Sequence, residues 1–258
     1  MAEKAAGNIS RSIGLGLRWF ARGVNHLLWP GVCESCGREA DDGDGGLCRQ
    51  CWQGLMACVA GDYCPACGRD ASLYAMIGGH CGDCAGRTIL WDGIARGGVY
   101  QGPLREMILA LKFRDRTETA NRLAGLLDAA VAARPFATEV DYVVPVPLHW
   151  RRRLWRGYNH AAVLVHSMRS RPGPISTDLV RVRHTPHQWN LSAAARRRNV
   201  KGAFAVRRGH DFSGRTVCVV DDITTSGATL NECALTLKEA GAARVYALVV
   251  ATANQDTD

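Results

Sequence analysis

The sequence lacks a stretch that would span a membrane. Its most apolar amino-terminal segment, residues 8–29, is interrupted by Arg11, Arg18 and Arg22 and by glycines, which makes it too polar to cross a bilayer. The same segment lacks the cleavage site of a secretory signal peptide. We therefore expect a protein without a membrane span that works in the cytoplasm.

Residues 8–29 do carry apolar side chains at helical spacing, including Ile9, Ile13, Leu17 and Phe20. We predict an amphipathic amino-terminal helix in residues 1–30, as the first of three parts of the chain. This helix either packs on the rest of the protein or lies on an anionic membrane surface.

Acidic side chains are scarce in one long region. Between His149 and Arg215 the chain has 15 Lys and Arg residues, and its only acids there are Asp178 and Asp211. So many unbalanced positive charges favour a polyanionic ligand, either bound phosphates or single-stranded nucleic acid. Four aromatic residues of this region are available for base stacking: Trp150, Trp155, Tyr158 and Trp189. The alternative is that the arginines are solvated and the aromatic side chains belong to the core.

Cysteine, by contrast, is abundant. Eight of the eleven cysteines form four Cys-x-x-Cys pairs: Cys33/Cys36, Cys48/Cys51, Cys64/Cys67 and Cys81/Cys84. Two such pairs complete a tetrahedral four-cysteine zinc site. Disulfides are the alternative, but a reducing compartment favours zinc. We predict two structural Zn²⁺ sites in residues 31–90, pairing first with second and third with fourth, while an interleaved pairing stays open.

Glycine and the remaining cysteines fit this interpretation. Gly37, Gly68 and Gly82 are expected to supply the turn conformations of the knuckles. Of the three cysteines outside the pairs, Cys218 and Cys233 are expected to be small core residues, and Cys58 has no evident role.

Residues 91–258 alternate strand and helix patterns. Apolar runs predict strands at 94–100, 142–146 and 217–220. Helical spacing predicts helices that open at Gly102-Pro103, at about 117–134, after a turn at Gly157, at 192–198 with Ser192 as cap, and at 230–240. This alternation predicts an α/β domain with a mostly parallel sheet, whose ligands bind at the carboxyl ends of the strands.

The most informative stretch is Val217 to Leu230. Asp221 and Asp222 directly follow the predicted buried strand. A loop of small and hydroxyl residues comes next and leads into a helix: Thr224, Thr225, Ser226, Gly227 and Thr229. Amides at a helix start bind phosphate, and paired acids one step earlier suit a vicinal diol. The stretch resembles the 5-phosphoribosyl-1-diphosphate (PRPP) motif of type I phosphoribosyltransferases, and an ordinary buried strand with a polar loop is the alternative.

A second loop follows the predicted strand 142–146, at the same edge of the sheet. It contains four arginines between residues 151 and 156. Guanidinium groups suit diphosphate, the multiply charged leaving group of PRPP. We predict diphosphate contacts from Leu148, His149, Arg153 and Arg156, and a solvated basic loop is the alternative.

Further blocks narrow the resemblance. They are the cysteine pairs, Leu111-Lys-Phe-Arg114, Pro145-Val-Pro-Leu148 with Arg156-Gly-Tyr-Asn159, and the stretch from Thr185 to Phe204. Together with the PRPP motif they resemble the ComF (ComFC/GntX) family from about residue 25 to the end. His160 stands where this family would have glutamine.

The resemblance implies a double zinc ribbon followed by a phosphoribosyltransferase domain in residues 91–258, with Mg²⁺ bound alongside PRPP. It also implies a cytoplasmic role in natural transformation or in the use of DNA as a nutrient. As an enzyme, the protein would transfer a phosphoribosyl group to an acceptor that the sequence does not name. As a binding module, it would hold PRPP and single-stranded DNA and dock to a competence helicase through its ribbon.

Overall fold

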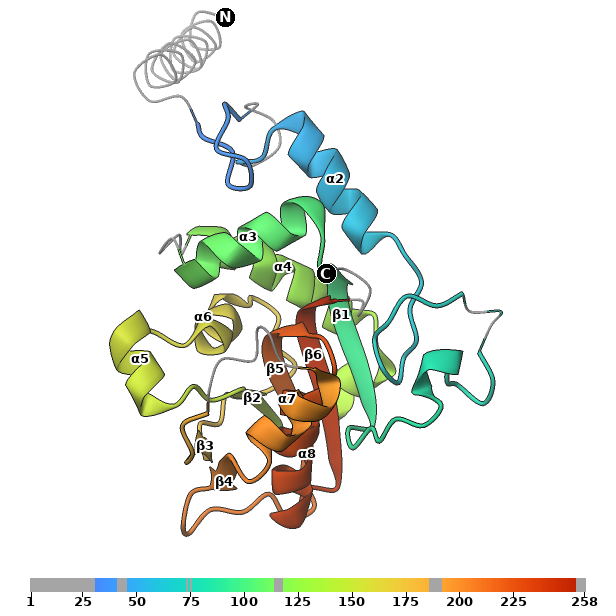
Figure 1. The fold of residues 1–258 in the computed structure, drawn as a ribbon, viewed down its shortest axis with the longest axis vertical. Coiled ribbons are helices and arrows are strands. Elements are labelled where there is room, and N and C mark those ends of the chain that lie inside the picture. The colour runs from blue at the N-terminus through green and yellow to red at the C-terminus, as the bar shows by residue number, and fades with distance from the viewer. Residues whose placement is uncertain are drawn as a thin grey trace, which may run out of the picture. The chain divides into compact units, whose positions relative to one another are not determined.

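A four-stranded parallel sheet forms the centre of the computed structural model, with strand order β1-β6-β5-β2 (Figure 1). The strands are β1 (Gly93–Val99), β2 (Tyr142–Pro145), β5 (Thr216–Thr224) and β6 (Arg244–Thr252). The central strands β5 and β6 are mostly buried, as expected when helices cover both faces of a parallel sheet. The predicted α/β class with a mostly parallel sheet is confirmed.

The structure describes residues 31–40, 46–72, 74, 76–113, 118–185 and 192–253, without the side chains of Arg156 and Ala193. The chain divides into two compact units, residues 1–54 and 55–258. The predicted amino-terminal helix lies outside the described residues, and the predicted boundaries after residues 30 and 90 stay predictions. No helix in the described part of the chain is both long and apolar enough to cross a membrane.

Helices cover the two faces of the sheet (Figure 1). On one face, α4 (Glu118–Ala132) and α6 (His160–Ser167) pack against the strands, and α3 (Gly102–Phe113) packs against α4. On the other face, α8 (Ala228–Glu239) buries Leu230 and Leu237 against Val217 and Val219 of β5. Alternate residues of β5 therefore enter different halves of the core, which is the period of a strand. Cys218 and Cys233 are fully buried, as predicted.

A small antiparallel pair extends the core on the α8 side. β3 (Leu179–Arg181) and β4 (Phe204–Val206) form this pair and contribute Leu179 and Phe204 to the core. Helix α7 (Ala193–Val200) lies between them in sequence and packs on α8. Its predicted cap is confirmed, because the Ser192 hydroxyl accepts a hydrogen bond from the Ala195 amide at 3.3 Å.

Two predicted elements differ from the structure. The strand expected to end at Val220 continues to Thr224, because the neighbouring strand β6 is long enough to pair with it up to that point. Thr224 is in register with Thr252, the last residue of β6. The basic segment expected to be a loop forms a short helix, α5 (Trp150–Arg156), which His149 caps by accepting the Arg151 amide at 3.3 Å. Helix formation satisfies backbone groups that an open loop would leave to water. The strands predicted at 94–100 and 142–146 are confirmed, with small shifts of their ends. The helices predicted to begin at Gly102, to span about 117–134 and to follow Gly157 are confirmed in the same way.

Strand β1 is an edge of the sheet, and the segment that contains the third cysteine pair lies against it. The Ile94 amide donates to the Pro65 carbonyl at 2.9 Å, and the Arg96 amide donates to the Tyr63 hydroxyl at 3.2 Å. Unpaired edge groups promote aggregation, so these contacts protect the edge. The remaining elements are α2 (Arg49–Val59) and the 3₁₀ turns η2 (Gly82–Cys84) and η3 (Pro135–Glu139).

Candidate functional site

Asp221 and Asp222 lie inside the last part of β5, not in a loop after it. Asp221 is in register with Val249, and Ile223 is in register with Ala251. Consecutive residues of a strand point to opposite faces, so the two carboxylates approach the carboxyl edge of the sheet from its two sides. The ladder fixes the backbone of both acids, which gives the pair a rigid base.

Lys112, in the last turn of α3, forms an ion pair with Asp222. The Lys112 Nζ and Asp222 Oδ2 atoms are 2.9 Å apart, and both side chains are largely shielded from solvent. The sequence offered Lys112 only as part of a block shared with a family, because nothing in its own helix indicates that α3 ends beside β5. The sequence interpretation missed this cation, which the structure holds at the acid pair.

Asp221 has an unusual electrostatic environment. Burial, followed by the negative charge of Asp222, raises the pKa of Asp221 to about 7, against the opposing effects of Lys112, the Asp222 amide and Arg181. The Asp222 amide donates to Asp221 Oδ1 at 2.9 Å. Near neutral pH, Asp221 is therefore poised between the carboxylic acid, which donates a hydrogen bond, and the carboxylate, which only accepts.

The hydroxyl loop joins β5 to α8. Gly227 is the residue before the helix and has φ 74°, a left-handed conformation that favours glycine. Thr224 and Ser226 are buried, while Thr225 and Thr229 are partly exposed. The first amides of α8 have no carbonyl partner within the helix, which makes this end attractive to anions. The structure thus brings all seven predicted PRPP residues to one strand end and helix start.

Two arginines hold this loop from other parts of the chain. Arg196 of α7 donates from Nη1 to the Thr225 hydroxyl at 2.8 Å. Arg87, which precedes β1, donates from Nη2 to the Ser226 carbonyl at 3.1 Å. Neither arginine was predicted as a site residue, since their positions depend on contacts between segments far apart in sequence.

The predicted diphosphate residues lie beside the acid-bearing strand. Pro145 of β2 is in register with Val220 of β5, and the Val146 amide donates to the Val220 carbonyl at 2.8 Å. Leu148 is partly exposed, His149 is buried and Arg153 is exposed. The backbone of Arg156 closes α5, and its side chain lies outside the described residues.

A pocket of about 510 Å³ opens next to this segment. Its lining includes Leu148 and Arg153 from the predicted diphosphate segment, together with Arg181 of β3 and Arg207. No residue with a carboxylate is among those that line it in the described part of the chain. Trp150 and Tyr158 add aromatic surface, so the pocket suits an anion that also carries an apolar or aromatic part.

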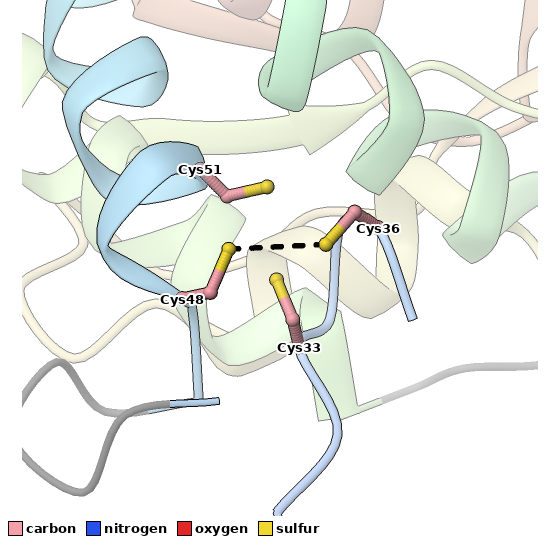
Figure 2. Close-up of side chains that lie close together, drawn as sticks. All are labelled: Cys33, Cys36, Cys48 and Cys51. Atoms are coloured by element: carbon pink, nitrogen blue, oxygen red, sulfur yellow. Dashed lines mark hydrogen bonds between the residues drawn. The ribbon is translucent and has the colours of Figure 1, made fainter. Parts of the chain in front are cut away.

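The first four-cysteine group is formed by Cys33, Cys36, Cys48 and Cys51, whose sulfur atoms all lie within 4.8 Å of one another (Figure 2). Figure 2 shows the four side chains converging on one point from two segments of the chain. Although burial opposes ionisation, backbone hydrogen bonds from Cys36, Cys48 and Ser35 lower the pKa of the Cys33 thiol to about 6. Burial raises the pKa of the Cys51 thiol to about 12. Zinc binds thiolates, and four cysteine sulfur atoms that converge on one point are its tetrahedral ligand set, so the site fits the metal.

The second group is formed by Cys64, Cys67, Cys81 and Cys84, again within 4.8 Å. Burial is again opposed by backbone hydrogen bonds, from Cys67, Cys81 and Ala66, which lower the pKa of Cys64 to about 7. The pairing is therefore first with second and third with fourth. Gly37 and Gly68 adopt left-handed φ angles of 75° and 77°, as expected. The expectation for Gly82 is wrong, because this residue begins the 3₁₀ turn η2 and Gly86 takes the left-handed turn instead.

Comparisons with known proteins agree with the presence of two kinds of site, the four-cysteine groups and the acid pair with its hydroxyl loop. A family model described as a double zinc ribbon domain matches residues 24–85, and one described as a phosphoribosyl transferase domain matches residues 159–258. The fold and the two sites therefore define a phosphoribosyltransferase-type domain combined with a double zinc ribbon, and the two four-cysteine groups are its zinc-binding sites.

Similarity along most of the chain identifies the family. The sequence is 35% identical over 215 residues to Competence protein F of Haemophilus influenzae, covering 81% of this chain and 91% of that protein. It is 34% identical over 225 residues to the DNA utilization protein YhgH of Salmonella typhimurium, covering 85% and 96%. It is 25% identical over 203 residues to Competence protein ComFC of Bacillus subtilis, covering 76% and 80%. The chain belongs to the ComF family.

Proposed function

We propose that this protein binds PRPP together with Mg²⁺ at the carboxyl end of β5. The observation that carries the proposal is the convergence of an acid pair, a hydroxyl loop and a helix start at one strand end, in a chain with a phosphoribosyl transferase domain. The loop Thr224–Thr229 would hold the 5-phosphate through its amides and hydroxyls. Asp221 and Asp222 would hold the ribose hydroxyls.

Lys112 adds a requirement to this mode of binding. Its ion pair with Asp222 neutralises a carboxylate that the ribose would contact. When the ligand binds, the ammonium either stays as a third member of the contact or moves to a phosphate oxygen of the ligand. Leu148, His149, Arg153 and Arg156 would surround the diphosphate from the neighbouring strand end, with positive charge supplied by the two arginines.

As a reaction, we propose transfer of the phosphoribosyl group to a nitrogen acceptor. The bond between C1 of the ribose and the diphosphate oxygen breaks, a bond from C1 to the acceptor forms, and the acceptor loses a proton. The carboxylates of β5 would stabilise positive charge on the sugar, and the arginines would stabilise the departing diphosphate. Bound Mg²⁺ would neutralise diphosphate charge through hard oxygen ligands.

In the cell, we propose that the protein acts in the cytoplasm in DNA uptake by natural transformation or in the use of DNA. This proposal is supported by the names of relatives that match most of the chain, Competence protein F and the DNA utilization protein YhgH. The acceptor is not indicated by these names.

A non-catalytic role is the second candidate. In it, the protein binds PRPP and single-stranded DNA and docks to a DNA-uptake helicase through its ribbon. The observation that favours it lies on α5, where Trp150 is 58% exposed and Trp155 is 76% exposed among arginines. Exposed aromatic rings beside guanidinium groups bind unpaired bases. Of the other two predicted stacking residues, Tyr158 is partly exposed and donates its hydroxyl to the Leu111 carbonyl at 2.6 Å, and Trp189 lies outside the described residues.

Titration calorimetry with PRPP and Mg²⁺ tests the ligand. The variant with both Asp221→Asn and Asp222→Asn is expected to lose affinity by about 100-fold or more, because two charge-assisted contacts are removed. Glu239→Gln, an exposed residue at the far end of α8, is the matched control and is expected to bind like the wild type. Unchanged affinity in the double variant would mean that the site lies elsewhere.

Diphosphate release distinguishes the two candidates. The protein is incubated with PRPP, Mg²⁺ and a panel of purines, pyrimidines and amines, and diphosphate is measured. Release with one acceptor supports the transferase. Absence of release with every acceptor, together with salt-sensitive binding of single-stranded DNA that Trp155→Ala weakens, supports the binding module.

A further inference from the structure

A short segment, residues 87–91, lies between the last zinc-binding cysteine and β1. It packs against the hydroxyl loop Thr224–Thr229, which is called the phosphate-binding loop below because it would hold the 5-phosphate. Arg87 donates to the Ser226 carbonyl at 3.1 Å. The Leu90 amide donates to the Asn231 side-chain oxygen at 2.7 Å, and the Asn231 side-chain nitrogen donates to the Thr88 carbonyl at 2.7 Å. The loop between β5 and α8 and the first turn of α8 are therefore both hydrogen-bonded to a segment that follows a zinc site.

Trp91 continues this connection into the zinc knuckle itself. Its indole Nε1 donates to the carbonyl of Ala66 at 2.7 Å, and Ala66 lies between the zinc-binding residues Cys64 and Cys67. The indole is 6% exposed and belongs to the core on the α8 side. It is therefore both a core side chain of the sheet domain and a hydrogen-bond donor to the knuckle.

The same indole lies directly against Gly227 of the phosphate-binding loop. A Cβ atom at residue 227 would come within 2.6 Å of Trp91 Cη2, closer than real Cβ atoms approach other atoms. Gly227 also has a left-handed φ angle. The backbone of the loop therefore packs on the Trp91 ring, and the hydrogen bond to the Ala66 carbonyl helps to fix the position of that ring.

Zinc determines whether Ala66 keeps its position. The second knuckle has few apolar side chains of its own, and in such modules the free energy of metal binding supplies the free energy of folding. Without zinc, the four thiols have no bond that joins them, so the Ala66 carbonyl is held only through its neighbours Pro65 and Gly68, which are hydrogen-bonded to β1. The first cysteine group belongs to the other compact unit and is not part of this series of contacts.

We propose that Trp91 and Arg87 are positioning residues through which the second zinc site holds the phosphate-binding loop, so that zinc at Cys64, Cys67, Cys81 and Cys84 sets the affinity for a ribose 5-phosphate group. The inference rests on the proposed PRPP function for its ligand. It assigns the two zinc sites different tasks, with only the second one acting on the loop.

Removal of one zinc site at a time tests the proposal. Cys81→Ser removes a ligand of the second site, and Cys48→Ser removes a ligand of the first, as matched control. Zinc content and PRPP affinity are measured at a temperature where circular dichroism shows both variants folded. Cys81→Ser is expected to weaken PRPP binding about tenfold or more, and Cys48→Ser to change it less than about twofold. Equal affinities in the two variants would overturn the proposal.

Variants that leave all eight cysteines intact separate positioning from general loss of structure. Trp91→Leu and Arg87→Met are expected to weaken PRPP binding about tenfold while zinc content stays unchanged, since each removes one hydrogen bond and one support of the loop. Trp91→Phe keeps a ring beside Gly227 and is expected to recover part of the affinity. Trp52→Ala, in the other unit, is the control. Wild-type affinity in both Trp91→Leu and Arg87→Met would contradict the proposal.

Hydrogen–deuterium exchange makes the result independent of the ligand. Amides of residues 225–231 are expected to exchange faster in Cys81→Ser and Trp91→Leu than in the wild type, and at wild-type rates in Cys48→Ser. If the zinc-loaded wild type bound no PRPP, the proposed ligand would be wrong, yet faster exchange would still support the coupling. Equal exchange in all variants would refute the coupling even if PRPP bound.

Discussion

The two four-cysteine groups have the same ligands and the same knuckle spacing, yet they are built into the protein differently. In the first, Cys36 is exposed, and among the described residues of its unit the buried apolar side chains besides its own cysteines are Ala40 and Leu47. In the second, Cys64, Cys67 and Cys81 form a buried cluster with Ala66, Met76 and Ile89 around it. Identical metal chemistry thus occurs with few buried apolar residues in one place and with a small buried cluster beside the sheet in the other.

Arg96 of β1 shows how far the second group is integrated. Its side chain is 1% exposed and donates from Nη1 to the Gly68 carbonyl at 2.9 Å and to the Thr252 hydroxyl at 2.8 Å. Its other nitrogen, Nη2, forms an ion pair with Asp70, and the guanidinium lies 4.6 Å from the centre of the Tyr63 ring. One buried cation therefore joins the knuckle to two strands of the sheet. A zinc knuckle can therefore cover the edge of a sheet.

The largest effect is expected from losing zinc. Cys81→Ser should lower the melting temperature of the sheet domain by about 10 °C or more, because it removes both the metal and the cover of β1. Cys48→Ser should lower it by no more than about 2 °C. Thermal unfolding followed by circular dichroism, with zinc content measured in parallel, checks both values. Equal decreases would show that the two groups are integrated to the same extent.

The next effect concerns Arg96 alone. Arg96→Met should lower the free energy of unfolding by about 3 kcal/mol, because it leaves the Gly68 carbonyl and the Asp70 carboxylate without their donor. Arg105→Met, which removes an exposed ion pair with Glu106, should cost less than about 1 kcal/mol. Urea unfolding measures both. A small loss in Arg96→Met would mean that packing, not the cation, joins the knuckle to the sheet.

A pair of glycines gives the most direct comparison of the two groups. Gly37 and Gly68 occupy equivalent turns with nearly the same left-handed φ angle, 75° and 77°. A Cβ at Gly37 would meet nothing within 4 Å, whereas at Gly68 it would meet Thr252 Cγ2 at 2.9 Å. Gly37→Ala should cost about 1 kcal/mol from backbone strain alone, and Gly68→Ala about 1–2 kcal/mol more from the clash. Equal costs would indicate that the Gly68 turn moves away from the sheet without penalty.

The smallest effect is expected from pH. Because the pKa of Asp221 is raised to about 7 in the folded protein, the unliganded site favours the protonated acid, and this group lowers stability as pH rises from about 4 to 7. A ligand that requires the carboxylate should bind about tenfold more tightly at pH 8 than at pH 6. Asp221→Asn should remove this dependence, and Cys48→Ser should retain it. Calorimetry at several pH values tests both, and an unaltered pH profile in Asp221→Asn would assign the titration to another group.

The sequence could predict those parts of the site that lie within one continuous stretch. The run from Val217 to Thr229 contains its strand, acids, loop and helix start in order, and each Cys-x-x-Cys pair contains its own two zinc ligands. The pairing of the Cys-x-x-Cys pairs depends on where the second pair of each group lies in space. The continuation of β5 through Asp221 depends on how far β6 extends beside it.

Contacts between distant segments could not be predicted. Lys112 meets Asp222 because α3 ends beside β5, and Trp91 meets Gly227 because β1 and α8 pack on the same core. Helix formation in the basic segment 150–156 was missed for a different reason. Its arginines gave no clear apolar periodicity, whereas the cap from His149 and the end at Gly157, which has φ 80°, define the helix locally.

Trp91 has a consequence for how genes of this kind can exchange parts. A crossover between codons 90 and 91 would join a ribbon from one ancestor to a sheet from another, and it would separate Trp91 from Ala66 and Ile94 from Pro65. Such a hybrid would inherit partners that had never been selected together. A crossover at the boundary of the two compact units, after residue 54, would keep these partners in one piece. We therefore expect the first knuckle to be exchanged or lost during evolution more readily than the second.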